Sequence, residues 1–263
     1  MKEAFELTMN WGGKSYPVDL SRGIDLSLPL RDEKKGWGTS AWYVGRPRFE
    51  PVEGDGFIGS VAQGGAVNFT NVFFNPHGHG THTECMGHIT PEAESIDSVV
   101  RDSKGFASLI PCLVHSVSPE SRDGDLVISI AHLPEMTELP PALVIRTLPN
   151  EEEKKYRKWD NTNPPYLDPD FTRELVNRGV EHLLIDLPSV DKEVDGGKLL
   201  GHRVFFGVPR SPRRSATITE FVYVPNGSPD GLYALNLQIA PFDLDASPSR
   251  PLLFPLRDSN RKG

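Results

Sequence analysis

A dense group of histidines occupies residues 76–88, which read PHGHGTHTECMGH. Half of the eight histidines of the chain fall in this stretch, and Glu84 lies among them. Imidazole nitrogens and a carboxylate are the donors of mixed nitrogen and oxygen metal sites, and glycines let the backbone turn sharply around a centre. A solvated surface loop would not place a Glu between histidines and then continue with apolar residues. The stretch therefore predicts a metal site.

The segments around this group predict a β-rich α/β fold. Runs that are β-branched or alternate in polarity, and that end at turn residues, predict strands over 66–74, 109–117, 142–147, 182–186, 216–224 and 232–239. Pro111 predicts an edge or a bulge in the second of these strands. Asn150 followed by three acids predicts one helix start, and Asp168-Pro169 with Gly179 brackets a second helix over 170–178. We expect one domain over residues 1–263.

The composition excludes several classes of protein. There are 28 Lys and Arg against 36 Asp and Glu, giving a net charge of −8, which argues against nucleic acid as a partner. No apolar run approaches the roughly 20 residues that a membrane span needs, so we expect no membrane association. Two cysteines, Cys85 and Cys112, provide no disulfide framework, and residues 1–7 do not read as a signal peptide. We expect a cytoplasmic protein.

One alternative for the metal site is a cupin, a β-barrel oxygenase fold. Its first metal-binding half would use His77, His79 and Glu84. Its second half has the form P-x-G-x-x-H-x-x-x-N, which does not occur downstream of the cluster. This alternative requires His79 as a ligand and excludes Glu220.

A second pattern fits the chain better. Residues 80–88, GTHTECMGH, resemble the H-x-G-T-H-x-D-x-P-x-H signature of the cyclase-like metal-dependent hydrolases, a family that includes bacterial kynurenine formamidase. Four more segments are similar to segments of that family and follow in its order: DLS at 19–21, LIDLPSVD at 184–191, ITEF at 218–221 and GLYAL at 231–235. Three positions depart from the signature. Gly78 stands where the family has its first His, Glu84 replaces Asp, and Met86 replaces Pro.

The resemblance implies a single-domain α/β fold of the swivelling β/β/α kind. It also implies a metal-dependent hydrolase that cleaves the C–N bond of an amide, formamide or cyclic amide in a small-molecule substrate, with arylformamidase-like activity. The metal ligands that it implies are His77, His82, Glu84, His202 and Glu220. These exceed the three or four that one catalytic zinc needs. We therefore expect one or two divalent ions, the pair being bridged by Glu84, with Zn²⁺ or Mn²⁺ as the metal. Family membership suggests a homodimer or homotetramer.

Glu220 also stands out from its own surroundings. In a strand over 217–224 it shares a face with Ile218, Val222 and Val224, and an unpaired carboxylate on an apolar face is costly. A bound cation would remove that cost. The alternative is that this face of the strand is simply exposed to solvent.

Two choices within the cluster rest on local geometry. We expect His77 rather than His79 as the first ligand, because Pro76 restrains its backbone while His79 lies between two glycines. We expect His88 as the general acid and base. On an extended chain positions 82, 84, 86 and 88 point the same way, which would bring the His88 ring near the metal. There it would take a proton from water and return it to the leaving nitrogen.

The remaining polar groups are assigned more simply. His115, His132 and His182 are expected to be structural, and both cysteines to be buried. Residues 209–214, PRSPRR, form either a solvated surface loop or an anion-binding loop at the mouth of the pocket, through Arg210, Arg213 and Arg214. Trp37 and Trp42 fall where the resemblance suggests loops that face the substrate. The alternative function is a degenerate family member that binds metal without turnover and serves as a binding or assembly protein.

Overall fold

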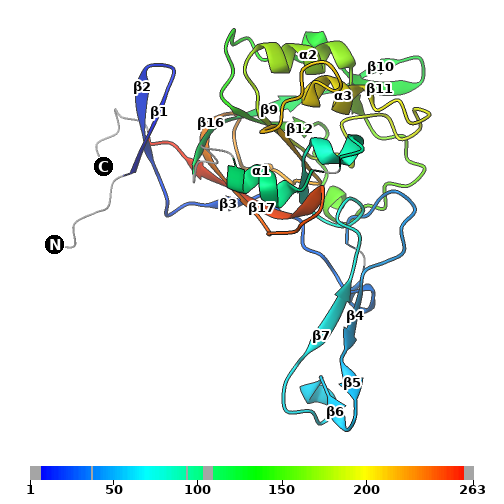
Figure 1. The fold of residues 1–263 in the computed structure, drawn as a ribbon. Coiled ribbons are helices and arrows are strands. Elements are labelled where there is room, and N and C mark those ends of the chain that lie inside the picture. The colour runs from blue at the N-terminus through cyan, green and yellow to red at the C-terminus, as the bar shows by residue number, and fades with distance from the viewer. Residues whose placement is uncertain (1–6, 37, 93, 103–108, 258–263) are drawn as a thin grey trace, which may run out of the picture.

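The computed structural model describes residues 7–36, 38–92, 94–102 and 109–257 (Figure 1). An eight-stranded sheet forms its centre, and the sheet closes on itself because β17 pairs with β16 as well as with β8. In hydrogen-bonding order its strands are β16 (Gly231–Ile239), β9 (Ile110–Val117), β12 (Ala142–Thr147), β14 (His182–Ile185), β15 (Thr217–Glu220), β8 (His82–Glu84), β17 (Ala246–Pro255) and β3 (Ile24–Asp25). β9, β12, β14 and β15 run parallel, and all the other pairings are antiparallel.

Alternating side chains divide the core between the two faces of this sheet. On β12, Leu143 and Ile145 belong to one buried cluster, whereas Ala142 and Val144 belong to another. The first cluster includes aromatic residues of α2 (Pro169–Asn177) and α3 (Leu200–Phe206), so these helices cover the outer face of the sheet. The second cluster fills the inside of the closed sheet. The α/β prediction is confirmed.

Several predicted elements agree closely with the structure. The run 142–147 is β12, 182–186 is β14 with its last residue outside the strand, and 232–239 is β16 with one more residue. The helix predicted over 170–178 is α2, where the Asp168 side chain accepts a hydrogen bond from the Asp170 backbone N–H. Strand 109–117 is β9, which is paired on both sides. Pairing of β9 with β12 begins at Cys112, one residue after Pro111. The missing backbone N–H of Pro111 therefore does not interrupt the hydrogen bonds between β9 and β12.

Two predicted elements differ from the structure, one in its length and the other in its type of helix. The strand expected over 216–224 ends at Glu220, because Phe221 adopts a left-handed backbone conformation with φ of 54°. Val222 and Val224 therefore do not share a strand face with Glu220. The predicted helix after Asn150 is a 3-10 helix, Glu152–Tyr156, and Asn150 donates instead to the Val224 carbonyl, 2.8 Å away. The other 3-10 helices are Glu33–Lys35, Val61–Gln63, Met86–Ile89 and Ile130–His132.

Smaller elements surround the central sheet. A hairpin of β1 (Leu7–Trp11) and β2 (Lys14–Val18) lies beside it, and β10 (Glu120–Arg122), β11 (Asp125–Ile128) and β13 (Tyr166–Leu167) form a small sheet near α2 (Figure 1). The remaining helix is α1 (Ile96–Asp102). None of the helices in the described ranges has the length and apolar character of a membrane span. The prediction about a signal peptide concerns residues 1–7, of which residues 1–6 lie outside the described ranges.

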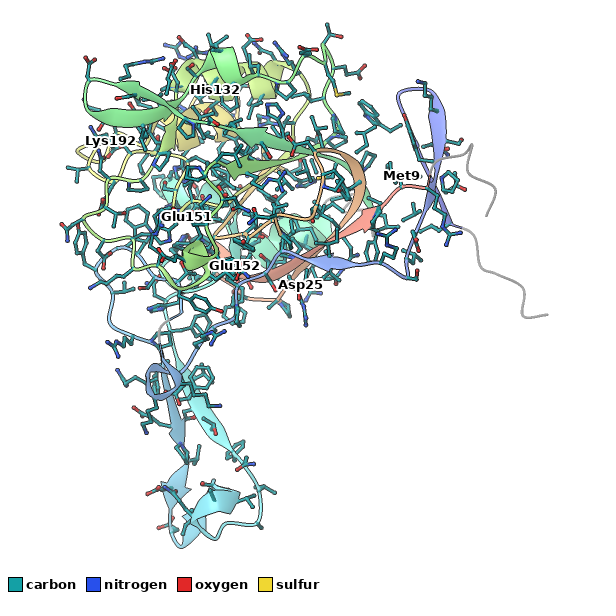
Figure 2. The ribbon with its side chains drawn as sticks, turned by 180° about the vertical axis from the view of Figure 1, so that it is seen from behind. Met9, Asp25, His132, Glu151, Glu152 and Lys192 are labelled. Atoms are coloured by element: carbon teal, nitrogen blue, oxygen red, sulfur yellow. The ribbon has the colours of Figure 1, made fainter. Side chains whose placement is uncertain are left out.

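An arm extends away from the rest of the molecule (Figure 1). It consists of β4 (Arg48–Pro51) paired with β7 (Thr70–Phe73), and of β5 (Glu53–Gly54) paired with β6 (Phe57–Ile58) at the tip. The strand predicted over 66–74 is reduced to β7, which lies in this arm and not in the core. In the view from behind, the side chains of the arm stand clear of the body (Figure 2). Phe57, Phe69 and Phe73 are among its exposed apolar residues.

Candidate metal centre

Strand β8 places two of the predicted ligands within the central sheet. It is only three residues long and lies between β15 and β17. His82 and Glu84 are two residues apart, so both side chains point to the same face. His82 is also the register partner of Glu220 on β15, and its Nε2 lies 3.3 Å from Oε2 of Glu220. Pairing of β8 with β15 thus joins the histidine cluster to a residue more than 130 positions away in sequence.

Glu84 is the hub of the site. Its side chain is buried, and three imidazole rings surround the carboxylate. Oε1 lies 2.8 Å from Nε2 of His202, while Oε2 lies 3.2 Å from Nδ1 of His77 and 3.9 Å from Nε2 of His88. Two neighbouring segments, the loop at 77 and the 3-10 helix at 86–89, and the distant helix α3 therefore converge on one carboxylate.

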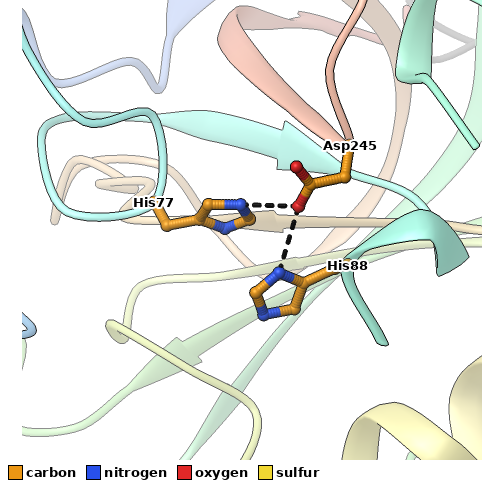
Figure 3. A group of neighbouring side chains, drawn as sticks. All are labelled: His77, His88 and Asp245. Carbon is orange, nitrogen blue, oxygen red and sulfur yellow. Dashed lines mark hydrogen bonds and ion pairs between the residues drawn. The ribbon is translucent and has the colours of Figure 1, made fainter. Parts of the chain in front are cut away.

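Asp245 is a functional candidate that the sequence reasoning missed. Its Oδ2 is 2.8 Å from Nε2 of His77 and 3.1 Å from Nδ1 of His88, so one carboxylate oxygen holds both rings (Figure 3). Asp245 directly precedes β17 and belongs to no pattern in the sequence. Only the pairing of β17 with β8 brings it to the cluster.

Asp191 plays a matching part for His202. Its Oδ2 is 2.6 Å from Nδ1 of His202, and its Oδ1 accepts a hydrogen bond from the Gly201 backbone N–H. The Asp therefore fixes both the start of α3 and the orientation of the ring, which leaves Nε2 facing Glu84. The signal for this residue was present, because Asp191 ends the segment LIDLPSVD, but its role was not predicted.

The residues present fit a divalent metal ion. Nε2 of His82, Nε2 of His202 and both oxygens of Glu84 are buried without a hydrogen bond, although the contact from His202 to Glu84 is only 2.8 Å. Buried polar atoms that approach closely without hydrogen-bond alignment are costly, and a cation between them satisfies all of them at once. Nitrogen and carboxylate donors suit Zn²⁺ and Mn²⁺ equally.

The possible ligands form three overlapping groups. The ligand atoms within each group lie within 4.8 Å of one another, and the groups are His77, His82, Glu84; Glu84, His88, His202; and His77, His88, Asp245. Glu84 belongs to two groups, which is the arrangement expected of a carboxylate that bridges two ions. Glu220 belongs to none of them, and its Oε1 accepts a hydrogen bond from the Val190 backbone N–H. The two-ion arrangement stays a prediction, and so does the role of each ligand.

The charges of the site are strongly coupled. Burial opposes ionisation of Glu84, but His88 and His202 outweigh it and hold the pKa of Glu84 well below its usual range. Burial likewise lowers the pKa of His202, and Glu84 and Asp191 reverse the direction and raise it. The Asp245 and Glu84 carboxylates raise the pKa of His77 to about 10 in spite of its burial. These shifts favour the protonated forms of His77 and His202 when no ion is bound, and metal binding would have to displace those protons.

The structure separates His79 from this cluster. Its Nδ1 accepts a hydrogen bond from the Asn75 backbone N–H at 2.9 Å, and it belongs to none of the three ligand groups. His77 is the residue that reaches Glu84. The ligand geometry that a cupin requires is therefore not the one assembled here. His115, His132 and His182 also lie elsewhere, hydrogen-bonded to the His132 carbonyl, the Ser118 carbonyl and Thr217 respectively.

His88 reaches the cluster by a different route from the one predicted. The chain is not extended from 82 to 88, because β8 ends at Glu84 and residues 86–89 form a 3-10 helix. This turn carries the His88 ring back over Glu84, where its side chain is 30% exposed. The extended-strand argument was wrong, whereas the expected proximity of the His88 ring to the predicted ligands is observed.

A pocket of about 260 Å³ opens beside the cluster. Trp42 and Val44 contribute apolar wall, His77 and His88 face it from the cluster, and Lys192 lies at its border. Trp37 lies outside the described residues. Cys85 and Cys112 are buried, as expected.

The basic loop at 209–214 does not line this pocket. Arg213 donates to the carbonyls of Phe205 and Val180, and Arg214 pairs with Glu94. Arg210 is exposed to solvent. The idea of an anion-binding loop at the mouth of the pocket was wrong, because Arg213 and Arg214 are engaged in these contacts and none of residues 209–214 lines the pocket.

Comparison with known proteins identifies a family and several similar folds. A family model described as "Putative cyclase" matches residues 24–192. Similar solved structures include a potential metal-dependent hydrolase with cyclase activity, 16% identical over 89% of this chain and 97% of its own, with a TM-score of 0.60. A predicted metal-dependent hydrolase from Bacillus stearothermophilus is 16% identical over 89% and 98%, with a TM-score of 0.56. Isatin hydrolase A from Labrenzia aggregata is 16% identical over 89% and 93%, with a TM-score of 0.61.

Proposed function

Because the chain belongs to the putative cyclase family, we propose that it is a metal-dependent hydrolase that cleaves the C–N bond of an amide, formamide or cyclic amide. The observation that carries the proposal is Glu84, a buried carboxylate that faces three imidazole rings with both oxygens lacking a hydrogen bond. In a purely structural core, buried polar atoms are paired by hydrogen bonds, so this arrangement favours a bound cation.

The residues that would hold the metal are His77, His82, Glu84 and His202, with Glu220 beside His82. When bound, a divalent ion supplies electrophilic activation of a carbonyl group and of water. The chain contributes the orientation of the donors. Asp191 turns Nε2 of His202 toward Glu84, and Asp245 turns Nδ1 of His77 toward the same carboxylate. Residues that orient ligands in this way typically change metal affinity 10- to 100-fold when they are removed.

His88 is placed to move a proton. Its Nδ1 is hydrogen-bonded to Asp245, so the neutral ring carries its proton on that nitrogen and offers the lone pair of Nε2 to the pocket. From there Nε2 can accept a proton from water and give it to the nitrogen that leaves the substrate. Asp245 keeps the ring in this orientation through the cycle.

The pocket favours a substrate with an aromatic or other flat apolar group next to the scissile amide. Trp42 and Val44 provide the apolar wall opposite the polar cluster, and a volume of about 260 Å³ accepts a small molecule. The similarity to an isatin hydrolase supports this choice, since isatin is an aromatic lactam. Aryl formamides and aromatic lactams are therefore the substrates to test first.

The experiment combines metal analysis with a hydrolysis screen. Protein purified without chelator should contain stoichiometric Zn²⁺ or Mn²⁺ and hydrolyse at least one member of a panel of formamides, amides and lactams. Glu84→Gln should lose both the metal and the activity, whereas His115→Ala, outside the cluster, should keep both. Metal without hydrolysis of any panel member would favour the alternative, a degenerate family member that only binds. Absence of metal from the unmodified protein would contradict both.

A further inference from the structure

A second cavity lies behind the wall of the proposed catalytic pocket. It has a volume of about 190 Å³ and forms where residues 29–31, the loop after residue 38 and the turn at 79–80 meet Lys158. Ser40 ties these segments together, because its N–H donates to the Arg157 carbonyl and its carbonyl accepts from the Trp159 N–H. Val44 lines both cavities and separates them. A ligand here would therefore be distinct from the substrate.

The lining of this cavity is strongly basic. Arg31, Arg46 and Lys158 contribute to it, and no Asp or Glu is present among the described residues that line it. The chain as a whole carries a net charge of −8, so three cations around one small cavity run against the average composition. Clustered positive charge in a concave site raises the local concentration of anions.

Arg31 is held in place without a carboxylate partner in the described part of the chain. Its guanidinium lies 5.1 Å from the centre of the Tyr156 ring, which fixes the side chain by a cation–π contact. Its Nε is buried and makes no hydrogen bond to a described residue, so contact with an anion in the cavity would fall to the two terminal nitrogens. Arginine presents its donors in a fork that matches the oxygens of carboxylate and phosphate groups.

Lys158 also retains hydrogen-bonding capacity. Its Nζ is 3.3 Å from Oδ2 of Asp160, but the other oxygen of Asp160 accepts from the Tyr43 backbone N–H at 2.9 Å. An ammonium group has three donors, and the Lys158 side chain is 55% exposed. His79 adds a neutral wall, since burial lowers its pKa and its Nδ1 already accepts from Asn75. His79, left aside by the metal cluster, thus belongs to this second cavity.

We propose that this cavity binds a small free anion, a carboxylate or a phosphate, through Arg31 and Lys158. The site is separate from the metal centre and does not depend on hydrolysis. The hydroxyl of Ser40, which also lines the cavity, offers a further donor to the same oxygens.

The test measures thermal unfolding of the protein as purified, in sodium phosphate, in sodium acetate and in NaCl at matched ionic strength. Phosphate or acetate should raise Tm in a saturable way above NaCl, and the anion with the lower half-saturating concentration identifies the class. Arg31→Gln and Lys158→Gln should each raise that concentration at least tenfold, since hydrogen bonds to charged groups are the strong ones. Each variant is compared with its own NaCl series, so a change in its basal Tm does not matter.

Two control variants locate the effect. Arg48→Gln removes a cation on the arm, where it pairs with Glu50, and should leave the response to the anion unchanged. Glu84→Gln should leave it unchanged as well, because the cavity is separated from the metal cluster by Val44. The proposal is overturned if neither anion raises Tm above NaCl, if Arg31→Gln and Lys158→Gln respond like the unmodified protein, or if Glu84→Gln abolishes the response.

Discussion

Replacing Lys154 by Met should destabilise the protein strongly, although the residue lies outside the metal cluster. Lys154 is buried, and its Nζ is 2.8 Å from Oδ2 of Asp186 and 2.6 Å from the Thr147 carbonyl. Asp186 also accepts hydrogen bonds from the N–H and the hydroxyl of Thr147. Lys154→Met would leave Asp186 as a buried charge without a cation.

The magnitude follows from this geometry. Removal of one partner of a buried ion pair costs about 3–5 kcal/mol. At roughly 2.1 cal/mol/K of unfolding entropy per residue, a domain of this length would lose roughly 5–9 °C in Tm. Lys14→Met, a change of the same kind on the exposed strand β2, should stay within about 0.5 kcal/mol of the unmodified protein.

The pH dependence of stability provides a second test of the predicted destabilisation. Burial raises the pKa of Asp186, and Lys154 opposes that shift. Without Lys154 the pKa rises further. An acid whose pKa is raised on folding favours the folded state most when it is protonated, so Lys154→Met should be less destabilising near pH 5 than near pH 8.

The assay is thermal and urea unfolding at the two pH values, with the double variant Lys154→Met/Asp186→Asn as the decisive sample. An Asn side chain can still accept from Thr147 but carries no charge, so the double variant should be more stable than Lys154→Met alone. The reasoning is refuted if Lys154→Met melts like Lys14→Met, or if the added Asp186→Asn change destabilises further.

Three further predictions concern other parts of the molecule. His88→Ala should keep its metal, measured by elemental analysis, while kcat falls at least about a hundredfold; loss of metal would make His88 a ligand. Burial lowers the pKa of His182 to about 4, so its ring is neutral in the folded protein at neutral pH. The free energy of unfolding should therefore fall by up to about 3 kcal/mol as the pH drops from 6.5 to 4, and His182→Gln should reduce this pH dependence in urea titrations. Phe57→Ser with Phe69→Ser on the arm should shift the expected homo-oligomer toward monomer in light scattering, whereas an unchanged mass would exclude the arm from the interface.

The parts of the fold that could be predicted are those whose signal is local. β12 begins with four apolar residues, ALVI at 142–145, and β14 ends with three, LLI at 183–185, as is typical of strands buried on both faces. α2 carries its own start and stop, with Asp168 as the cap and Gly179 in a left-handed conformation after its end. These features need no knowledge of the rest of the chain.

The parts that could not be predicted depend on pairing between distant segments. β8 has three residues, too few for any periodic pattern, and its position is fixed by β15 and β17. Asp245 reaches the cluster only through β17. β15 ends early, at Glu220, because Phe221 adopts a left-handed backbone conformation. Bulky aromatic residues rarely adopt this conformation, so the sequence does not indicate it.

The departures from the family signature are consistent with an intact site rather than a degenerate one. A Cβ atom at Gly78 would lie 2.6 Å from Cγ2 of Val44 and 3.2 Å from the Ala41 carbonyl, so a side chain at the position of the family's first His would require Val44 to move. His77, one position earlier, is the residue proposed for that role, and its Nδ1 comes within 3.2 Å of Glu84. Glu84 is the second departure, and its side chain is one methylene longer than the Asp of the family. The one-residue shift of the proposed ligand and the longer carboxylate compensate for each other, because the His77 ring and the Glu84 carboxylate still come into contact. A site losing its function would have no reason to keep that match.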